Sequence, residues 1–473
     1  MTTRATNGAP AFSGAQAYRY LKALTVEIGP RHGGSKGEQK AARYIRDVFK
    51  SHGLKASLFP YKTHTFDTAA SSLSFPGIGA VECVPAPCCE STPAKGVTAD
   101  LAMVETGHEM CLDASMKGKV LITIGGFGGK HMDALVAIKP AGLIMIGNNL
   151  HKRHFRGKYG ADSIRRHGSV PMVHVTYEDG LRIVEARPAR CTVRVTTKGE
   201  RMDTSYNPIG ELRGTEKPDE IIVIGGHYDS VWGSQGSQDN AGGMAIVMEL
   251  ARLFARHGSR RTLRFMGFGA EEHGLCGSTA YVKKLKDEDD KLKKNEDFVR
   301  DGLKSELDRI IFMVNIDVQG VKLGTNSAWT LGHGDIPASV RLLAAELLRP
   351  HNTHENACYS SDNAPFGKAG VPSVSFGRYG ADTGYGHTDQ DVIDHCDAAG
   401  LARAGEFIEL WMKRYITDSL SFPFSRTLPG PSAESVKNYF GEPDPFKYKP
   451  VFPKKYYKPR KSGKTRARRR GKK

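Results

Sequence analysis

The most constraining feature of this sequence is an alternation of apolar and amphipathic segments that begins near residue 219. Four short and nearly continuous apolar runs, EIIVIGG, TLRFMGFGA, IIFMVNID and VPSVSFG, predict buried strands. Residues 241–256, 339–348 and 401–415 carry apolar side chains at helical spacing. Apolar strands separated by amphipathic helices are typical of a sheet that is covered on both faces. The sequence therefore predicts an α/β fold with a mixed, largely parallel sheet and helices on both faces.

The rest of the chain divides into further parts by composition. Residues 13–62 predict two helices of the same domain, joined by the glycine-rich GPRHGGSKGE. Residues 63–200 alternate shorter strands and helices, which predicts a small α/β or β-rich domain. The main domain then occupies residues 201–418. We expect a Pro-rich extended segment at 419–445 and a basic disordered tail at 446–473.

The net charge of +17 is concentrated in that tail. From Phe446 to Lys473 there are 14 Lys and Arg and no Asp or Glu, and subtracting 14 from 17 leaves about +3 for residues 1–445. The nearly neutral body excludes a nucleic-acid binder inferred from the isoelectric point alone. For the tail we expect a solvated extension without a specific partner. Weak contact with nucleic acid or an anionic surface, through its interleaved Lys, Arg and Tyr, is the alternative.

The cellular compartment is predicted from what the sequence lacks. No apolar run approaches the roughly 18 residues that span a bilayer, and MTTRATNGAPAF has no apolar stretch of a secretory signal. The clustered Cys83, Cys88 and Cys89 lack the second pair that a structural zinc site needs. We expect a cytoplasmic protein with reduced thiols, or a secreted one if the N-terminus is a trimmed form.

Residues able to bind a metal follow each strand of the alternating region. EIIVIGG runs into His227, with Asp229 two residues on. The other candidates, in chain order, are Asp239, Glu271, Glu272, Asp317 and His387. Because ligands of open α/β sheets bind at the carboxyl ends of the strands, we expect these side chains to converge.

The types of these residues indicate a pair of metal ions. Two His and three carboxylates are nitrogen and oxygen ligands that suit zinc or a similar divalent ion. Five ligands are too many for one four-coordinate zinc, but they fit two ions if one carboxylate bridges them. One of Glu271 and Glu272 can then bind a metal while the other acts as a general base. Asp229 is well placed to hold the second ring nitrogen of His227.

Five motifs in order, GGHYDS, SQDNAGG, GAEEHGLCGS, NIDVQG and GHTDQD, resemble those of the co-catalytic di-zinc aminopeptidase family. Its relatives include bacterial leucyl aminopeptidases, glutamate carboxypeptidase II and plasma glutamate carboxypeptidase. The resemblance implies a fold of the zinc exopeptidase type and a cofactor of two zinc ions per chain. It also implies a bridging Asp239, often followed by a cis peptide, a general base Glu271 and an orienting Asp229. The full ligand set implied is His227, Asp239, Glu272, Asp317 and His387.

Two further resemblances concern the ends and the middle of the catalytic region. GSKGEQKAARYIRDVFKSHGL resembles the N-terminal helix of the family. GKVLITIGGFGGK, AIKPAGLIMIGNN and VPMVHVTYEDG resemble a protease-associated domain, which in relatives is inserted within the peptidase and shapes access to its active site.

The position before the last histidine departs from the family, because many relatives have an oxyanion-stabilising Tyr where this chain has Gly386. Tyr385 and Tyr379 are the candidate substitutes.

These observations predict a metal-dependent exopeptidase acting on peptides, with an aminopeptidase preferred. A carboxypeptidase or dipeptidase on the same scaffold is the alternative, for which Arg378 and Arg264 are candidate partners of the substrate carboxylate. A catalytically dead binding protein with this fold would have lost ligands. Because all five ligands and the base are present, the enzyme is the favoured hypothesis.

Overall fold

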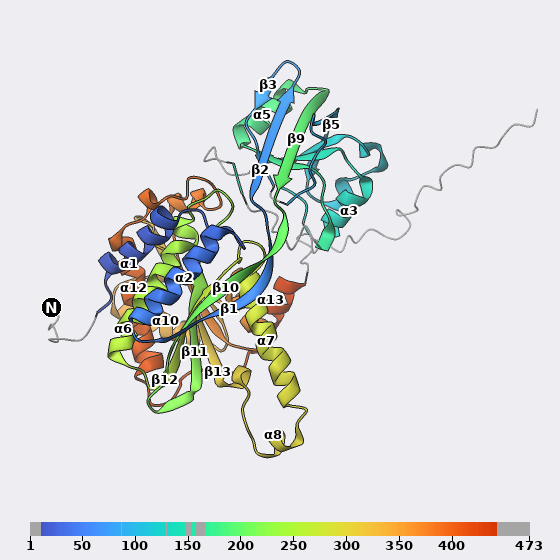
Figure 1. Cartoon of the computed structure of the whole chain (residues 1–473). Helices are drawn as coiled ribbons and strands as arrows, with labels where there is room; N and C mark the ends of the chain where they lie inside the picture. Colours follow the sequence, from blue (N-terminus) through green and yellow to red (C-terminus); the bar gives the residue numbers. More distant parts are fainter. Residues whose placement is uncertain (1–10, 87, 129, 148–153, 157–165, 442–473) are drawn as a thin grey trace, which may run out of the picture.

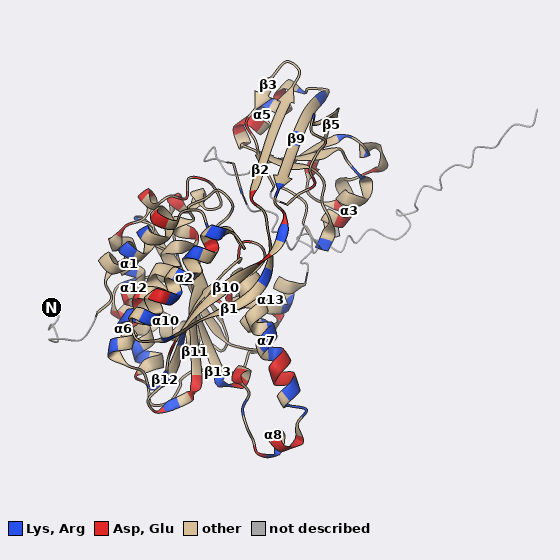
Figure 2. Ribbon diagram, in the orientation of Figure 1, with Lys and Arg blue, Asp and Glu red and all other residues tan. Residues whose placement is uncertain are grey.

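The computed structural model describes residues 11–86, 88–128, 130–147, 154–156 and 166–441 (Figure 1). These residues form two units, each built around an eight-stranded sheet. No helix in these ranges is long and apolar enough to cross a membrane. Lys and Arg are interspersed with Asp and Glu over the helices of both units, as expected for a body that is close to neutral (Figure 2).

The main sheet has the strand order β1-β10-β12-β11-β13-β16-β14-β15. Its four inner strands, β12, β11, β13 and β16, pair in parallel, whereas β1 and β10 are antiparallel additions at one edge and β14 is antiparallel to β16. The sheet is thus mixed and largely parallel at its centre, which confirms the prediction. The bounds are β1 Lys55–Thr65, β10 Arg201–Leu212, β11 Lys217–His227, β12 Arg261–Phe268, β13 Ile310–Ile316, β14 Thr325–Leu331, β15 His351–Glu355 and β16 Ser373–Tyr379.

Helices cover both faces of this sheet. One face carries α1 (Gly14–Lys22), α2 (Lys36–Ser51), α6 (Gly242–His257), α10 (Asp335–Glu346) and α12 (Ala398–Met412). The other face carries α7 (Cys276–Leu292), α9 (Glu306–Arg309) and α11 (Asn363–Lys368), and α8 (Glu296–Arg300) lies in the connection after α7. On β11, Ile222 and Ile224 join the first core, and Ile221 and Val223 join the second. Burial on both faces explains why the central parts of these strands are largely apolar on both sides.

The second unit is an insertion between two paired strands of the main sheet. The antiparallel pair β1 and β10 ends at Thr65 opposite Arg201, so the chain leaves and re-enters the main domain at one point (Figure 1). The inserted sheet has the order β3-β2-β9-β5-β6-β7-β8-β4. Its strands are β2 Thr68–Phe75, β3 Gly79–Val81, β4 Val84–Pro85, β5 Val97–Thr106, β6 Val120–Ile124, β7 Gly142–Ile146, β8 Met172–Val175 and β9 Arg190–Lys198, and its helices include α3 Lys130–Ile138 and α5 Tyr177–Ala186.

The segment expected to be Pro-rich and extended contains a helix instead. Helix α13 spans Gly430–Phe440 and packs against α11, with Val436 buried and the Ser432 hydroxyl accepting a hydrogen bond from the Gly332 N–H group at 3.0 Å. The prolines do not prevent it, because Pro429 caps its start and Pro431 lies in the first turn, where no backbone N–H donor is required. The basic tail predicted at 446–473 lies outside the described residues.

Candidate metal centre

The predicted metal ligands come from five separate segments at the carboxyl ends of the inner strands. His227 is the last residue of β11, and Asp317 follows β13 directly. Asp239 lies in the short turn Ser237–Ala241 that precedes α6, Glu272 in the turn between β12 and α7, and His387 in the loop after β16. Gly226 allows the ends of β11 and β13 to lie close together, because a Cβ atom at this position would lie 2.3 Å from the carbonyl oxygen of Ile316.

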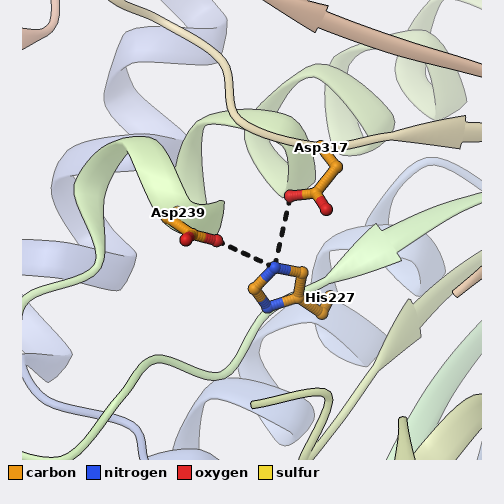
Figure 3. A group of neighbouring side chains, drawn as sticks. All are labelled: His227, Asp239 and Asp317. Carbon is orange, nitrogen blue, oxygen red and sulfur yellow. Dashed lines mark ion pairs between the residues drawn. The ribbon is translucent and has the colours of Figure 1, made fainter. Parts of the chain in front are cut away.

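Figure 3 shows the first group of ligands, in which two carboxylates point at one imidazole. The Nε2 atom of His227 lies 3.1 Å from Oδ1 of Asp239 and 3.3 Å from Oδ1 of Asp317. One ligand atom from each of these residues lies within 4.8 Å of the others. Three such atoms can surround a single ion.

A second group shares Asp239 with the first. The Nε2 atom of His387 lies 3.1 Å from Oδ2 of Asp239 and 3.1 Å from Oε2 of Glu272. Asp239 therefore turns one oxygen toward each histidine, which is the arrangement of a bridging carboxylate. The peptide bond that follows it, Asp239–Asn240, is cis.

The electrostatics of the two groups fit divalent cations. His227 is 1% exposed, and burial disfavours its charged form, but Asp317 and Glu271 outweigh that effect and raise its pKa well above the usual value. Burial likewise opposes the charge of His387, while Glu272 and Asp239 raise its pKa. Burial raises the pKa of Glu272, because it disfavours a carboxylate without a cation. Metal ions would supply positive charge to this nitrogen and oxygen donor set.

Asp229 supports both the histidine and the acidic pair. Its carboxylate is 0% exposed, and Oδ1 lies 3.4 Å from Nδ1 of His227. The same carboxylate accepts hydrogen bonds from the N–H groups of Glu271 at 3.0 Å and Glu272 at 3.2 Å. It is therefore placed to fix the ring orientation of His227, with Nε2 directed at the carboxylates.

Glu271 lies beside the ligands without belonging to the two groups that share Asp239. One of its carboxylate oxygens lies within 4.8 Å of ligand atoms of His227 and Glu272. Burial raises its pKa well above the usual range, and the carboxylates of Glu272, Asp362 and Asp317 add to the increase. A carboxylate with a raised pKa is suited to accept a proton near neutral pH.

The structure separates the two tyrosines that were candidate oxyanion donors. The Tyr379 hydroxyl shares a short hydrogen bond with the hydroxyl of Tyr359, and burial and the nearby Asp317 raise the pKa of both tyrosines. The ring of Tyr385 instead stacks on His395, with 4.6 Å between the ring centroids. The charge of the candidate ligand Asp317 therefore acts on Tyr379. The sequence interpretation missed its partner Tyr359.

Two buried aspartates at the centre were also missed. Asp391 accepts hydrogen bonds from the N–H groups of Gln238 at 2.9 Å and Asp239 at 3.1 Å, so it holds the bridging residue, and burial raises its pKa to about 7. Asp362, 0% exposed, lies close enough to Asp317 and Asp229 to feel their charges, and burial raises its pKa to about 7 as well. Asp391 is the last residue of GHTDQD and Asp362 lies in SDNAPF, and their places in these two segments were the available signal.

The two arginines proposed to bind a substrate carboxylate are engaged elsewhere. Arg264 is held by Glu211, Glu306 and the Tyr281 hydroxyl. Arg378 donates from Nε to the carbonyl oxygen of Val321 at 3.1 Å and lines a pocket that includes none of the five candidate ligands.

The inserted unit reaches the metal centre through residues 154–156. The backbone N–H group of Arg156 donates a hydrogen bond to the carbonyl oxygen of His387 at 2.7 Å. The centroids of the Phe155 and His387 rings lie 5.2 Å apart. The Arg156 guanidinium lies 3.6 Å from an Asp389 oxygen and 5.2 Å from the centre of the Trp232 ring. Because Asp389 is two residues from His387, these contacts connect the inserted unit to the loop that carries the last candidate ligand.

Comparison with known proteins adds the family. Residues 207–412, the span that carries all five candidate ligands, match Peptidase family M28. These residues belong to peptidase family M28. Aminopeptidase YwaD of Bacillus subtilis (strain 168) is 28% identical over 409 residues, which cover 84% of each protein.

Two further similarities frame the M28 assignment. Carboxypeptidase Q of Homo sapiens is 24% identical over 299 residues, which cover 57% of this chain and 61% of that protein. The solved structure of BSAP, a zinc aminopeptidase from Bacillus subtilis, superposes with a TM-score of 0.68 at 24% identity and covers 88% of this chain and 98% of that one. The superposition shows that the fold of that protein extends over most of this chain.

Proposed function

We propose that this M28 peptidase is an aminopeptidase that uses two zinc ions to release N-terminal residues from peptides. The observation that carries the proposal is the position of Asp239, whose two oxygens each lie 3.1 Å from a different histidine. Two ions bridged by Asp239 would take His227 and Asp317 on one side and His387 and Glu272 on the other. Zinc and aminopeptidase activity are also named for BSAP, and aminopeptidase activity for YwaD.

The roles of the side chains follow from their positions. When bound, two zinc ions would polarise the scissile carbonyl and lower the pKa of a water molecule between them. Glu271, with its raised pKa, takes a proton from the attacking water and passes it to the leaving amine. Tyr379 is the preferred candidate for the hydroxyl that donates a hydrogen bond to the oxyanion, since the charge of Asp317 acts on it. The hydroxyl of its neighbour Tyr359 can accept or donate in the hydrogen bond between the two tyrosines.

A carboxypeptidase or dipeptidase is the second candidate, and one observation favours it. Arg156 places a cationic group beside the loop of His387, where a substrate carboxylate could be bound. Carboxypeptidase Q is also among the relatives of this chain. Against this candidate, Arg264 and Arg378 are both engaged away from the ligands. Aminoacyl substrates compared with N-blocked dipeptides distinguish the two activities, because hydrolysis of only the blocked compounds would overturn the aminopeptidase.

The role of Glu271 is tested in the zinc-loaded full chain. Glu271→Gln is expected to lower kcat by about 10²–10⁴-fold while the zinc content stays close to two ions per chain, because only the proton acceptor is lost. The matched control is Glu288→Gln, which replaces an exposed glutamate of α7 that pairs with Lys284. Full activity of Glu271→Gln would contradict the proposed base. A purified chain that binds no metal would instead support the catalytically dead binding protein.

For the tail at 446–473, which lies outside the described residues, we propose a solvated extension without a specific nucleic-acid partner. Deletion of 446–473 is then expected to change neither the peptidase activity nor the affinity of the protein for nucleic acid. A large loss of nucleic-acid affinity at low salt on deletion would support the alternative.

A further inference from the structure

A pocket lined by three arginines lies at the edge of the main sheet, apart from the metal centre. Its volume is about 550 Å³, within the range of small-molecule sites. It is lined by the start of β14, the connection from α10 to β15, the end of β16 and one residue of α12. The lining residues are Gly324, Thr325, Asn326, Leu348, Arg349, Pro350, Asn352, Arg378 and Arg403. Three of them are arginines and none is an Asp or Glu.

Arg378 is the buried member of this group, with an exposed fraction of 3%. Its Nε donates to the carbonyl oxygen of Val321 at 3.1 Å and its Nη1 to Oδ1 of Asn326 at 3.1 Å. Both partners are neutral, and among the described residues no carboxylate forms an ion pair with this guanidinium. Burial and the positive charge of Arg403 lower the pKa of Arg378, and Asp397 offsets part of this effect. A buried cation without a close anion is costly, so an anionic ligand would be stabilising.

The other two arginines add charge at the mouth of the pocket. Arg349 pairs with Glu406 through Nη2 at 2.8 Å, while its Nη1 is buried without a hydrogen-bond partner. Arg403 is exposed on α12. Two acids that act on these arginines are already engaged, since Glu406 binds Arg349 and Asp397 accepts a hydrogen bond from the Gly400 N–H group at 2.6 Å as the cap of α12.

We propose that this pocket binds a small anion that carries phosphate or carboxylate groups. Guanidinium groups present planar pairs of N–H donors that match the oxygens of both groups. The side-chain amides of Asn326 and Asn352 add neutral hydrogen-bonding groups to the lining. Arg378 directly precedes Tyr379 in β16, and neighbouring residues of a strand point to opposite faces of the sheet. The anion would therefore lie on the face of β16 opposite to the Tyr379 side chain. This site is independent of the peptidase assignment, since none of its residues belongs to the metal centre.

The test uses the zinc-loaded full chain, with inorganic phosphate and succinate as separate probes in isothermal titration calorimetry. Because Arg378 is buried and its replacement can impair folding, the variant is the double substitution Arg349→Ala with Arg403→Ala at the mouth. We expect it to weaken the affinity for the preferred probe by about tenfold or more, since two charge-assisted contacts are lost. The control Arg300→Ala, an exposed arginine of α8, is expected to leave affinity unchanged.

Anions can also bind to the basic tail and to the zinc ions, but these are the same in all forms of the protein. A difference in affinity between the variants therefore reports binding in this pocket. Equal affinity in the double variant and the unmodified chain would show that anions bind only elsewhere and would overturn the proposal. Absence of binding by both probes at millimolar concentration would overturn it too. A preference for phosphate over succinate, or the reverse, identifies which kind of anionic group the pocket takes.

Discussion

At the scale of single residues, Asp229 decides how firmly His227 is held. It contacts Nδ1 of His227 and receives the N–H groups of Glu271 and Glu272, so Asp229→Asn should loosen the imidazole and the acidic turn together. We expect the zinc affinity to fall about 10–100-fold. Competition with a chromophoric zinc chelator measures it, and Asp290→Asn on the exposed side of α7 is the control. Equal affinities in the two variants would contradict the supporting role of Asp229.

Tyr379 at the end of β16 and Tyr385 in the loop that follows give a second prediction at this scale. Tyr379→Phe should lower kcat about 100-fold with little change in KM, because it removes a hydroxyl beside Asp317 that can stabilise an oxyanion. Tyr385→Phe is the matched control and should remain near full activity, because its ring stacks on His395. Steady-state kinetics on an aminoacyl substrate measures both. A larger loss in Tyr385→Phe would reverse the assignment.

The same scale shows which site residues the sequence could reveal. The five candidate ligands were predictable because each follows an apolar strand, and strand ends converge at one edge of a parallel sheet. Asp362 and Asp391 were not predictable on this basis. Asp362 precedes the short helix α11, where an aspartate is usually a cap, and Asp391 acts through backbone N–H groups that only the folded loop brings to it.

At the scale of elements, helix α13 should stabilise the side of the domain that carries α11. Val436 is buried, and a Cβ atom added at Gly367 of α11 would lie 3.1 Å from its Cγ2 atom, which shows how closely the two helices pack. Val436→Ala should lower the free energy of unfolding by about 1–3 kcal/mol, because it removes two buried methyl groups. Urea unfolding measures it. The exposed Glu434→Ala should change it little, and a similar change in both would argue against packing.

This helix also shows where sequence patterns fail at the element scale. The inner strands were predictable, because both of their faces are buried and the apolar runs are continuous. Only Ser432 and Val436 of α13 are buried, so the helix has no periodic apolar face, and Pro429 and Pro431 favour an extended interpretation. Its position is set by contacts with distant residues such as Gly332 and Cys358, whose N–H group donates to the Ser435 hydroxyl at 2.9 Å.

At the scale of the whole molecule, the insertion between β1 and β10 contacts the catalytic domain next to a ligand. The resemblance of the middle segment to a protease-associated domain implies the insertion, but the sequence cannot show which residues of the insertion meet the centre. Among the described residues of the insertion they include Phe155, against the His387 ring, and Arg156, against Asp389 and Trp232. The insertion therefore contacts the loop that carries the last candidate ligand, His387.

Arg156→Ala tests this connection. It removes the ion pair with Asp389 and the contact with Trp232 but leaves the backbone hydrogen bond to His387 available, so the loop should become less well positioned. We expect kcat/KM on an aminoacyl substrate to fall about tenfold, because small displacements of catalytic groups are costly, while the thermal stability of the protein changes little. Arg182→Ala, at an exposed position of α5 in the same unit, is the control. If N-blocked substrates alone lost activity in Arg156→Ala, its guanidinium would be a binding group for the substrate carboxylate, and the carboxypeptidase hypothesis would replace the aminopeptidase.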